Sequence, residues 1–160
     1  MELVWNAASG QLLTTLRGHT NDVYGAVFSP DGQRIVTKSK DETVLRVLNA
    51  VSGRLLATWQ DQTGHAYAVF SPDGQRILTA GEELFHPDST QDFTASEAKT
   101  ARVWNAVSGQ PLITLQGHTG YVESAEFSPD GQRIVTASED KTSRVFRVVT
   151  LSEIAELLSK

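Results

Sequence analysis

Short segments of β-branched, aliphatic and aromatic residues alternate along this chain with clusters of Gly, Pro, Asn, Asp and Ser. Residues 34–37 and 133–136 both read Arg-Ile-Val-Thr, and residues 101–104 read Ala-Arg-Val-Trp. Segments of this length and composition are typical of β-strands, and the clusters between them are typical of turns. The pattern therefore predicts an all-β fold built from short strands.

An identical octapeptide, Phe-Ser-Pro-Asp-Gly-Gln-Arg-Ile, occurs at residues 28–35, 70–77 and 127–134. The first two copies start 42 residues apart and the next two start 57 apart, which is one period plus an excess of 15 residues. Such repetition indicates an array of one supersecondary unit that stacks on its own copies.

Two turn signals recur in every repeat. In residues 29–32 the proline presets φ, the aspartate can accept backbone amides and the glycine tolerates positive φ, which together predict a type I turn that closes a hairpin. A second signal, Asn-Ala-Ala/Val-Ser-Gly, occurs at residues 6–10, 49–53 and 105–109. Each repeat is therefore predicted to be a meander of four antiparallel strands, whose two apolar faces need neighbouring sheets to cover them.

The order Gly-His-Thr, Phe-Ser-Pro-Asp-Gly, Ser-x-Asp-x-Thr and Val-Trp-Asn resembles the WD40 repeat, in the form frequent in bacterial repeat proteins. The resemblance covers about residues 1–148, and it implies that each unit is the four-stranded blade of a β-propeller. It places the third and fourth strands of one blade at about 2–5 and 11–16, and complete blades at about 22–59 and 66–115. Three inner strands follow at about 121–147. We therefore expect an all-β, partial and open β-propeller of about three to three and a half blades over residues 1–149.

The excess residues lie within 81–98 and predict a loop inserted into the middle blade. Residues 85–89 and 94–100 match 127–131 and 136–142, so the insertion is a decayed partial duplicate. Arg76–Ala80 and Asp92–Ser96 consequently compete to be the second strand of that blade. We favour Arg76–Ala80, because it directly follows an intact Pro-Asp-Gly turn, and we expect the remainder to be a long acidic loop.

The periodicity changes at the end of the chain. Thr150 and Glu153 have the spacing of a capping box, and Leu151, Ile154, Ala155 and Leu158 follow at the spacing of one helical stripe. We predict a short amphipathic helix over residues 150–160 that covers the edge of the last blade. The alternative is an interaction helix.

The WD40 resemblance also implies a buried, hydrogen-bonded tetrad of His, Ser or Thr, Asp and Trp in each blade. The matching positions hold, blade by blade, His19, Thr37 and Asp41, then Thr79 and Trp104, then His118, Thr136 and Asp140. Thr94 is the alternative to Thr79. No tetrad is complete, since Leu48 and Phe146 stand at tryptophan positions, and in the middle blade Asp61-Gln62 occupies the Gly-His place and Ala98 the aspartate place. An absent partner that leaves a buried polar group unpaired costs about 1–3 kcal/mol, so these blades are expected to be less stable than consensus ones.

Composition narrows the functional classes. The chain has 14 Lys and Arg against 19 Asp and Glu, so its net charge is −5. A protein with this charge lacks the positive electrostatic potential that binding to nucleic acid requires. No apolar run approaches the roughly 20 residues of a membrane span, and the N-terminus lacks a signal-like apolar core. The absence of cysteine fits a reducing compartment. We therefore expect a cytoplasmic protein with neither a nucleic-acid nor a membrane partner.

The candidate chemical motifs have simpler structural interpretations. Ser-x-x-Lys strings occur at residues 96–99 and 138–141, but both stand at one strand-turn-strand position and lack partner motifs. His86 lies near Asp88 and Asp92 without the spacing of a calcium loop or of a His-x-x-x-His site. We expect no enzyme activity, no catalytic residues, no cofactor and no metal.

The resemblance instead implies a protein-protein interaction scaffold. WD40 propellers bind proteins or peptides on the face formed by loops that lead into the innermost strands and by turns between the second and third strands. The matching positions on this face are Asn21, Tyr24, Lys40, Tyr67, Tyr121, Glu123 and Glu139. Aromatic anchors surrounded by charge are typical of binding hot spots.

Three alternatives stay open. The chain starts within a repeat, which fits a truncated C-terminal part of a larger WD40 signalling or sensor protein. It also fits a half-propeller that self-associates: pairing of strand 11–16 with the last blade of another copy gives a closed ring of six blades as a homo-oligomer. The third alternative is a hydrolase whose site is assembled from several loops.

Overall fold

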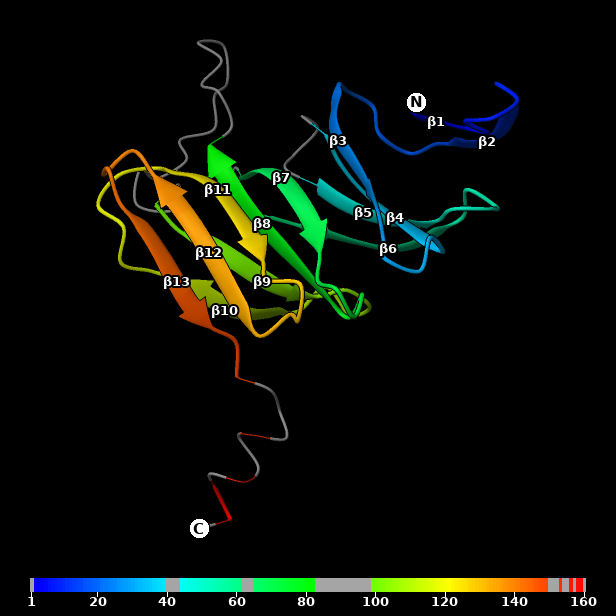
Figure 1. Ribbon diagram of the computed structural model, residues 1–160. Helices are drawn as coiled ribbons and strands as arrows, with labels where there is room; N and C mark the ends of the chain where they lie inside the picture. The colour runs from blue at the N-terminus through cyan, green and yellow to red at the C-terminus, as the bar shows by residue number, and fades with distance from the viewer. Residues whose placement is uncertain are drawn as a thin grey trace.

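The computed structural model describes residues 2–39, 44–61, 65–82 and 99–149, together with residues 153, 156, 158 and 159. Its described strands form four antiparallel sheets that follow one another along the chain (Figure 1). We call these sheets the N-terminal pair, the first blade, the second blade and the third blade.

Each sheet is a simple meander of consecutive strands. The N-terminal pair contains β1 (Glu2–Trp5) and β2 (Leu12–Leu16), and the first blade contains β3 (Val23–Phe28), β4 (Arg34–Ser39), β5 (Val44–Asn49) and β6 (Leu55–Gln60). The second blade contains β7 (His65–Phe70), β8 (Arg76–Glu82), β9 (Ala101–Asn105) and β10 (Pro111–Leu115). The third blade contains β11 (Val122–Phe127), β12 (Arg133–Ser138) and β13 (Ser143–Arg147).

This architecture confirms the predicted all-β fold of open propeller blades. β8 pairs with both β7 and β9, so the favoured segment, Arg76–Ala80, does lie in the second strand of the middle blade. The competing segment, Asp92–Ser96, lies outside the described residues. The predicted helix over residues 150–160 is not seen among the described elements, and most of those residues also lie outside the described part.

The octapeptide forms the turn that its residues predict. In the first copy the Gly32 amide donates to the Ser29 carbonyl over 2.8 Å, and Gly32 has a φ of 69°, in the left-handed region that glycine adopts most readily. The Ser29 hydroxyl donates to the Asp31 carboxylate, which also accepts the Gln33 amide at 3.0 Å. The corresponding residues of the other two copies make the same hydrogen bonds.

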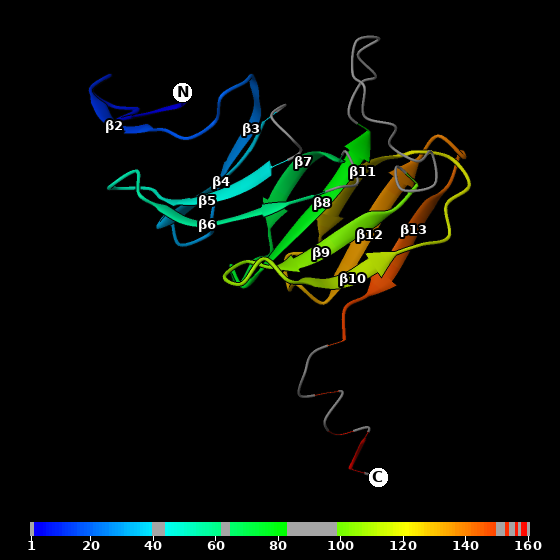
Figure 2. The same ribbon diagram turned by 180° about the vertical axis from the view of Figure 1, so that it is seen from behind.

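The hydrophobic core lies between successive sheets. One cluster joins Val36, Leu45 and Val47 of the first blade to Ala68, Phe70 and Ile77 of the second. Another joins Leu78 and Val103 of the second blade to Ala125, Phe127 and Ile134 of the third, and a smaller one joins Val4 and Leu16 to Ile35 and Leu48. Each sheet thus covers a face of the next, a succession that is also visible from behind in Figure 2.

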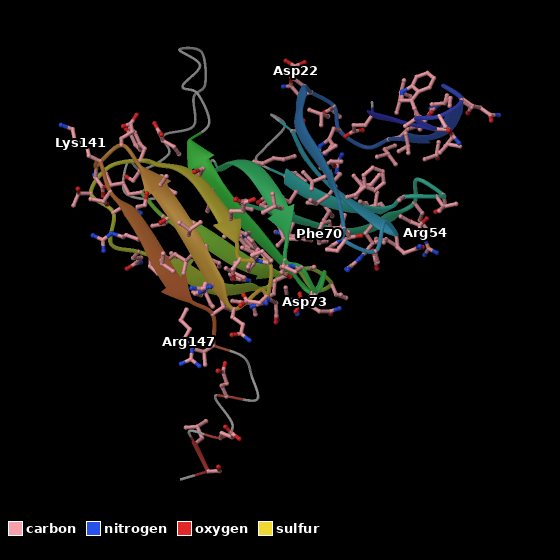
Figure 3. The ribbon with its side chains drawn as sticks, viewed as in Figure 1. Asp22, Arg54, Phe70, Asp73, Lys141 and Arg147 are labelled. Carbon is pink, nitrogen blue, oxygen red and sulfur yellow. The ribbon has the colours of Figure 1, made fainter. Side chains whose placement is uncertain are left out.

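The meander sorts the connections to two ends of the blades. The segments that lead into β3 and β11 lie at one end together with the start of β7 and the turn between β12 and β13, and we call this the loop end. The octapeptide turns and the hairpins between the third and fourth strands lie at the other end, which we call the hairpin end. Figure 3 shows Asp22 and Lys141 at the loop end, and Asp73 and Arg54 toward the hairpin end.

Candidate functional site

Asn21 stands at the loop end, exposed and immediately before the inner strand β3. Its side-chain oxygen accepts the amide of Asp22 at 2.8 Å, and the Asp22 carbonyl accepts the Ser39 hydroxyl at 2.8 Å. The loop into β3 is therefore tied to the end of β4, which fixes the position from which Asn21 projects.

Two of the predicted face positions are the extra residues of β-bulges. The register between β3 and β4 shifts between Val23 and Gly25, which places Tyr24 in the bulge, and the register between β11 and β12 shifts around Glu123 in the same way. Bulges re-aim side chains next to binding sites. Tyr67 pairs with Ala80 in the second blade. The side chains of Tyr24 and Tyr67, and the whole of Lys40, lie outside the described part of the chain.

In the third blade the two loops that carry Tyr121 and Glu139 lie side by side. The Glu139 amide donates to the Tyr121 carbonyl over 3.0 Å, and a side chain at Gly120 would come within 2.7 Å of the Asp140 amide nitrogen. Glycine is needed there for the close approach of the two backbones. Tyr121 is half-buried, whereas Glu123 and Glu139 are exposed, so the structure presents an aromatic residue flanked by two carboxylates.

A hydrogen-bond network around His118 holds these loops together. His118 Nδ1 lies 2.8 Å from Asp140 Oδ2, and His118 Nε2 lies 2.7 Å from Thr136 Oγ1. Asp140 also accepts the Thr142 hydroxyl, the Thr119 amide at 3.0 Å and the Thr142 amide at 2.9 Å. The hydroxyl of Thr142, followed by His118 and the Thr119 amide, holds the pKa of Asp140 well below its ordinary range, although burial acts in the opposite direction.

The other tetrad positions come together in pairs. His19 Nε2 lies 2.9 Å from Thr37 Oγ1, and the Trp104 indole nitrogen donates to Thr79 Oγ1 over 3.0 Å. Asp41 and Thr94 lie outside the described residues. These groups are engaged in internal hydrogen bonds that link neighbouring strands and loops of the blades.

Sequence reasoning missed a buried ion pair between the first and second blades. Lys38 Nζ lies 3.8 Å from Asp61 Oδ2, and both side chains are buried. The sequence hints at this ion pair only in that both residues differ from the repeat consensus. Lys38 stands where the other blades have Ala80 and Ala137, and Asp61 stands where the third blade has Gly117.

Sequence reasoning also missed an arginine contact that links successive blades. Arg34 Nη2 donates to the Gly74 carbonyl over 2.6 Å, and the Arg34 guanidinium lies 5.2 Å from the centre of the Phe70 ring. Arg76 repeats this with the Gly131 carbonyl at 3.2 Å and the Phe127 ring at 5.3 Å. We call this contact the arginine staple. The octapeptide contains the Phe, Gly and Arg of the staple, but sequence alone does not show that the arginine reaches the next copy.

Metal-ligating clusters and membrane-spanning helices were sought among the described residues. They include no group of three or more His, Cys, Asp or Glu side chains that could hold a metal ion. In the same part of the chain there is no helix with the length and apolar character needed to cross a bilayer.

Comparison with known proteins agrees with the blade architecture. Residues 10–45 and 109–147 match the family described as WD domain, G-beta repeat. A stretch of 55 residues, 34% of this chain, is 42% identical to an uncharacterized WD repeat-containing protein of Synechocystis sp.. The match spans 16% of the length of that relative.

Proposed function

From the WD40 repeats that this chain carries, stacked as propeller blades, we propose that it is a non-catalytic scaffold that binds a protein or peptide at its loop end. A fold of this kind supports many functions, so the proposal depends on the site itself. The observation that supports it is that Tyr121, Glu123 and Glu139 lie at the start of β11 and in the turn between β12 and β13, which the His118 network joins. A face that is already ordered loses little conformational entropy on binding.

The charge of the loop end indicates the chemistry of the partner. Asp22, Glu123 and Glu139 are exposed there beside Lys141, and the sequence between β8 and β9 holds further carboxylates. Complementary charge accelerates association and selects among partners. We therefore propose a partner that presents Lys or Arg side chains around an apolar group that contacts the tyrosines. The cytoplasm is the proposed location, for the reasons of composition given above.

The test compares variants at the two ends of the blades. A partner captured by cross-linking to the full chain is purified, and its affinity is then measured for Tyr121→Ala, Tyr24→Ala and Tyr67→Ala. Arg54→Ala, at the exposed hairpin end, is the control. The proposal predicts a loss of about tenfold or more for at least one tyrosine variant, since aromatic residues dominate hot spots, and no change for the control. Equal affinities for all four variants would contradict it.

A further inference from the structure

The two interfaces between blades inside the chain are built from equivalent residues. Val36 and Val47 on the outgoing face of the first blade are each 1% exposed, because they pack in one cluster with Phe70 of the second blade, which is 8% exposed. Leu78 and Val103 pack in the same way with Phe127 of the third blade.

At the two ends of the array these same positions are uncovered. Val135 and Val145, the equivalents of Val36 and Val47, pair across β12 and β13 and are 43% and 65% exposed. Phe28, the equivalent of Phe70 and Phe127, is 54% exposed on the first blade. The third and first blades therefore expose two complementary halves of an interface that the described residues form twice.

The arginine staple is incomplete in the same two places. Arg133 is the third copy of Arg34 and Arg76, is exposed, and makes no side-chain hydrogen bond to any described residue. Its missing partners are the equivalents of Gly74 and Phe70. In the first blade these are the Gly32 carbonyl and the ring of Phe28.

We propose that the third blade of one copy docks on the first blade of a second copy, head to tail. In this contact Val135 and Val145 cover Phe28, and Arg133 binds the Gly32 carbonyl and the Phe28 ring. The occupant is a second copy because the surface it needs is the one that this chain exposes at its other end. The inference is independent of binding at the loop end.

Docking requires β13 of the first copy to take the place of β1 in the second copy. Both are third strands of a blade, and Val4 of β1 occupies, against Ile35 and Leu48, the place that Val145 would take. β1 is held only in part, because Trp5 is 54% exposed whereas its equivalent Trp104 is 4% exposed. After the exchange β2 pairs with β13 and completes a four-stranded sheet, which removes an open edge.

The contact is heterologous, since each copy contributes a different surface. Such contacts close into a ring when the rotation between copies permits it. Each copy then has two complete blades and shares its third blade with β2 of its partner, so a closed dimer contains six four-stranded sheets.

The test is sedimentation velocity of the full 160-residue chain across micromolar concentrations. The wild type is expected to form a reversible dimer. Phe28→Glu, Val145→Glu and Arg133→Ala should each weaken the dimer about tenfold or more, because each acts in both interfaces. Val107→Glu, which alters an exposed residue on the β9–β10 hairpin of the second blade, is the matched control and should sediment as the wild type does. Circular dichroism establishes that every variant is folded.

A mixture distinguishes a head-to-tail contact from a symmetric one. Phe28→Glu and Val145→Glu, mixed in equal amounts, retain one undamaged interface between them and should form a heterodimer that neither variant forms alone. Val4→Ser should strengthen the dimer, because it loosens the strand that competes with β13. A wild-type monomer at all concentrations, a mixture without heterodimer, or a dimer weakened by Val4→Ser would overturn the proposal.

Discussion

Lys38 Nζ lies 3.8 Å from Asp61 Oδ2 at the interface between the first two blades, where the two side chains are 2% and 0% exposed. Lys38 shares with Val36 the face of β4 that packs on the second blade, and Asp61 follows β6 directly in the connection to that blade. Charges removed from water in this way stabilise each other, because the loss of either one takes an opposite charge away from its buried partner.

Substitution of either residue of this pair alone should lower the free energy of unfolding strongly, whereas substitution of both together should lower it much less. Lys38→Ala and Asp61→Gly introduce the residues found at these positions in the third blade, Ala137 and Gly117. Each alone should lower the free energy of unfolding by about 3–5 kcal/mol, since the remaining charge stays buried. Urea unfolding of the two single variants and the double variant measures the coupling. Additive losses would show that the two groups do not interact.

The indole of Trp104 depends on one hydroxyl in the buried interior. Thr79→Val keeps the shape of the side chain but removes the acceptor 3.0 Å from the indole nitrogen. The unpaired donor should lower the free energy of unfolding by about 1–3 kcal/mol. Thr79→Ser keeps the hydroxyl and should therefore lose less unfolding free energy. Thr58→Val, at an exposed strand position, is the control. The assignment is wrong if Thr79→Val is as stable as the wild type.

Stability should fall in acid, and Asp140 should contribute to the fall. Its pKa in the folded protein lies below the ordinary 3.8, because the Thr142 hydroxyl, His118 and the Thr119 amide stabilise the carboxylate. Hydrogen bonds from Ser29 and Ser128 likewise lower the pKa of Asp31 and Asp130. Below the ordinary value the unfolded chain binds more protons than the folded chain, so this stabilisation is present above about pH 4 and is lost as the pH falls further.

Asp140→Asn provides the measurement for this group. The variant should be less stable than the wild type at neutral pH, and its urea midpoint should change less between about pH 5 and pH 2, because the titrating carboxylate is absent. Asp22→Asn, at an exposed position outside the His118 network, is the control. Parallel pH profiles for the wild type and Asp140→Asn would contradict the role given to this carboxylate.

Much of the fold follows from local patterns. The octapeptide specifies its own turn, because Pro, Asp and Gly each favour the conformation that the turn needs, and the repeat spacing then locates the four strands of each blade. The choice of Arg76–Ala80 was predictable for the same reason, since an intact turn directly precedes it. The WD40 pattern also predicts the pairs His19–Thr37, Thr79–Trp104 and His118–Thr136, whose polar atoms lie 2.9, 3.0 and 2.7 Å apart.

The contacts between blades were harder to predict. A repeat shows which residues are equivalent, but it does not show that Arg34 reaches forward to Gly74 and Phe70, because that depends on how closely the sheets approach. The ion pair of Lys38 and Asp61 joins residues that belong to no shared motif. The bulge at Tyr24 is likewise a property of strand register, which the spacing of hydrophobic residues does not reveal.

Both proposals depend on the stacking of each blade on the next. Substitution of the equivalent arginine in each of the three octapeptides tests this stacking directly. Arg34 and Arg76 each donate to the following blade, whereas Arg133 has no following blade among the described residues. At concentrations low enough to keep the chain monomeric, urea unfolding should show that Arg34→Ala and Arg76→Ala each lose about 1–2 kcal/mol of hydrogen-bond and cation-π stabilisation. Arg133→Ala should unfold as the wild type does. Equal losses in all three variants, or none in the first two, would contradict the account.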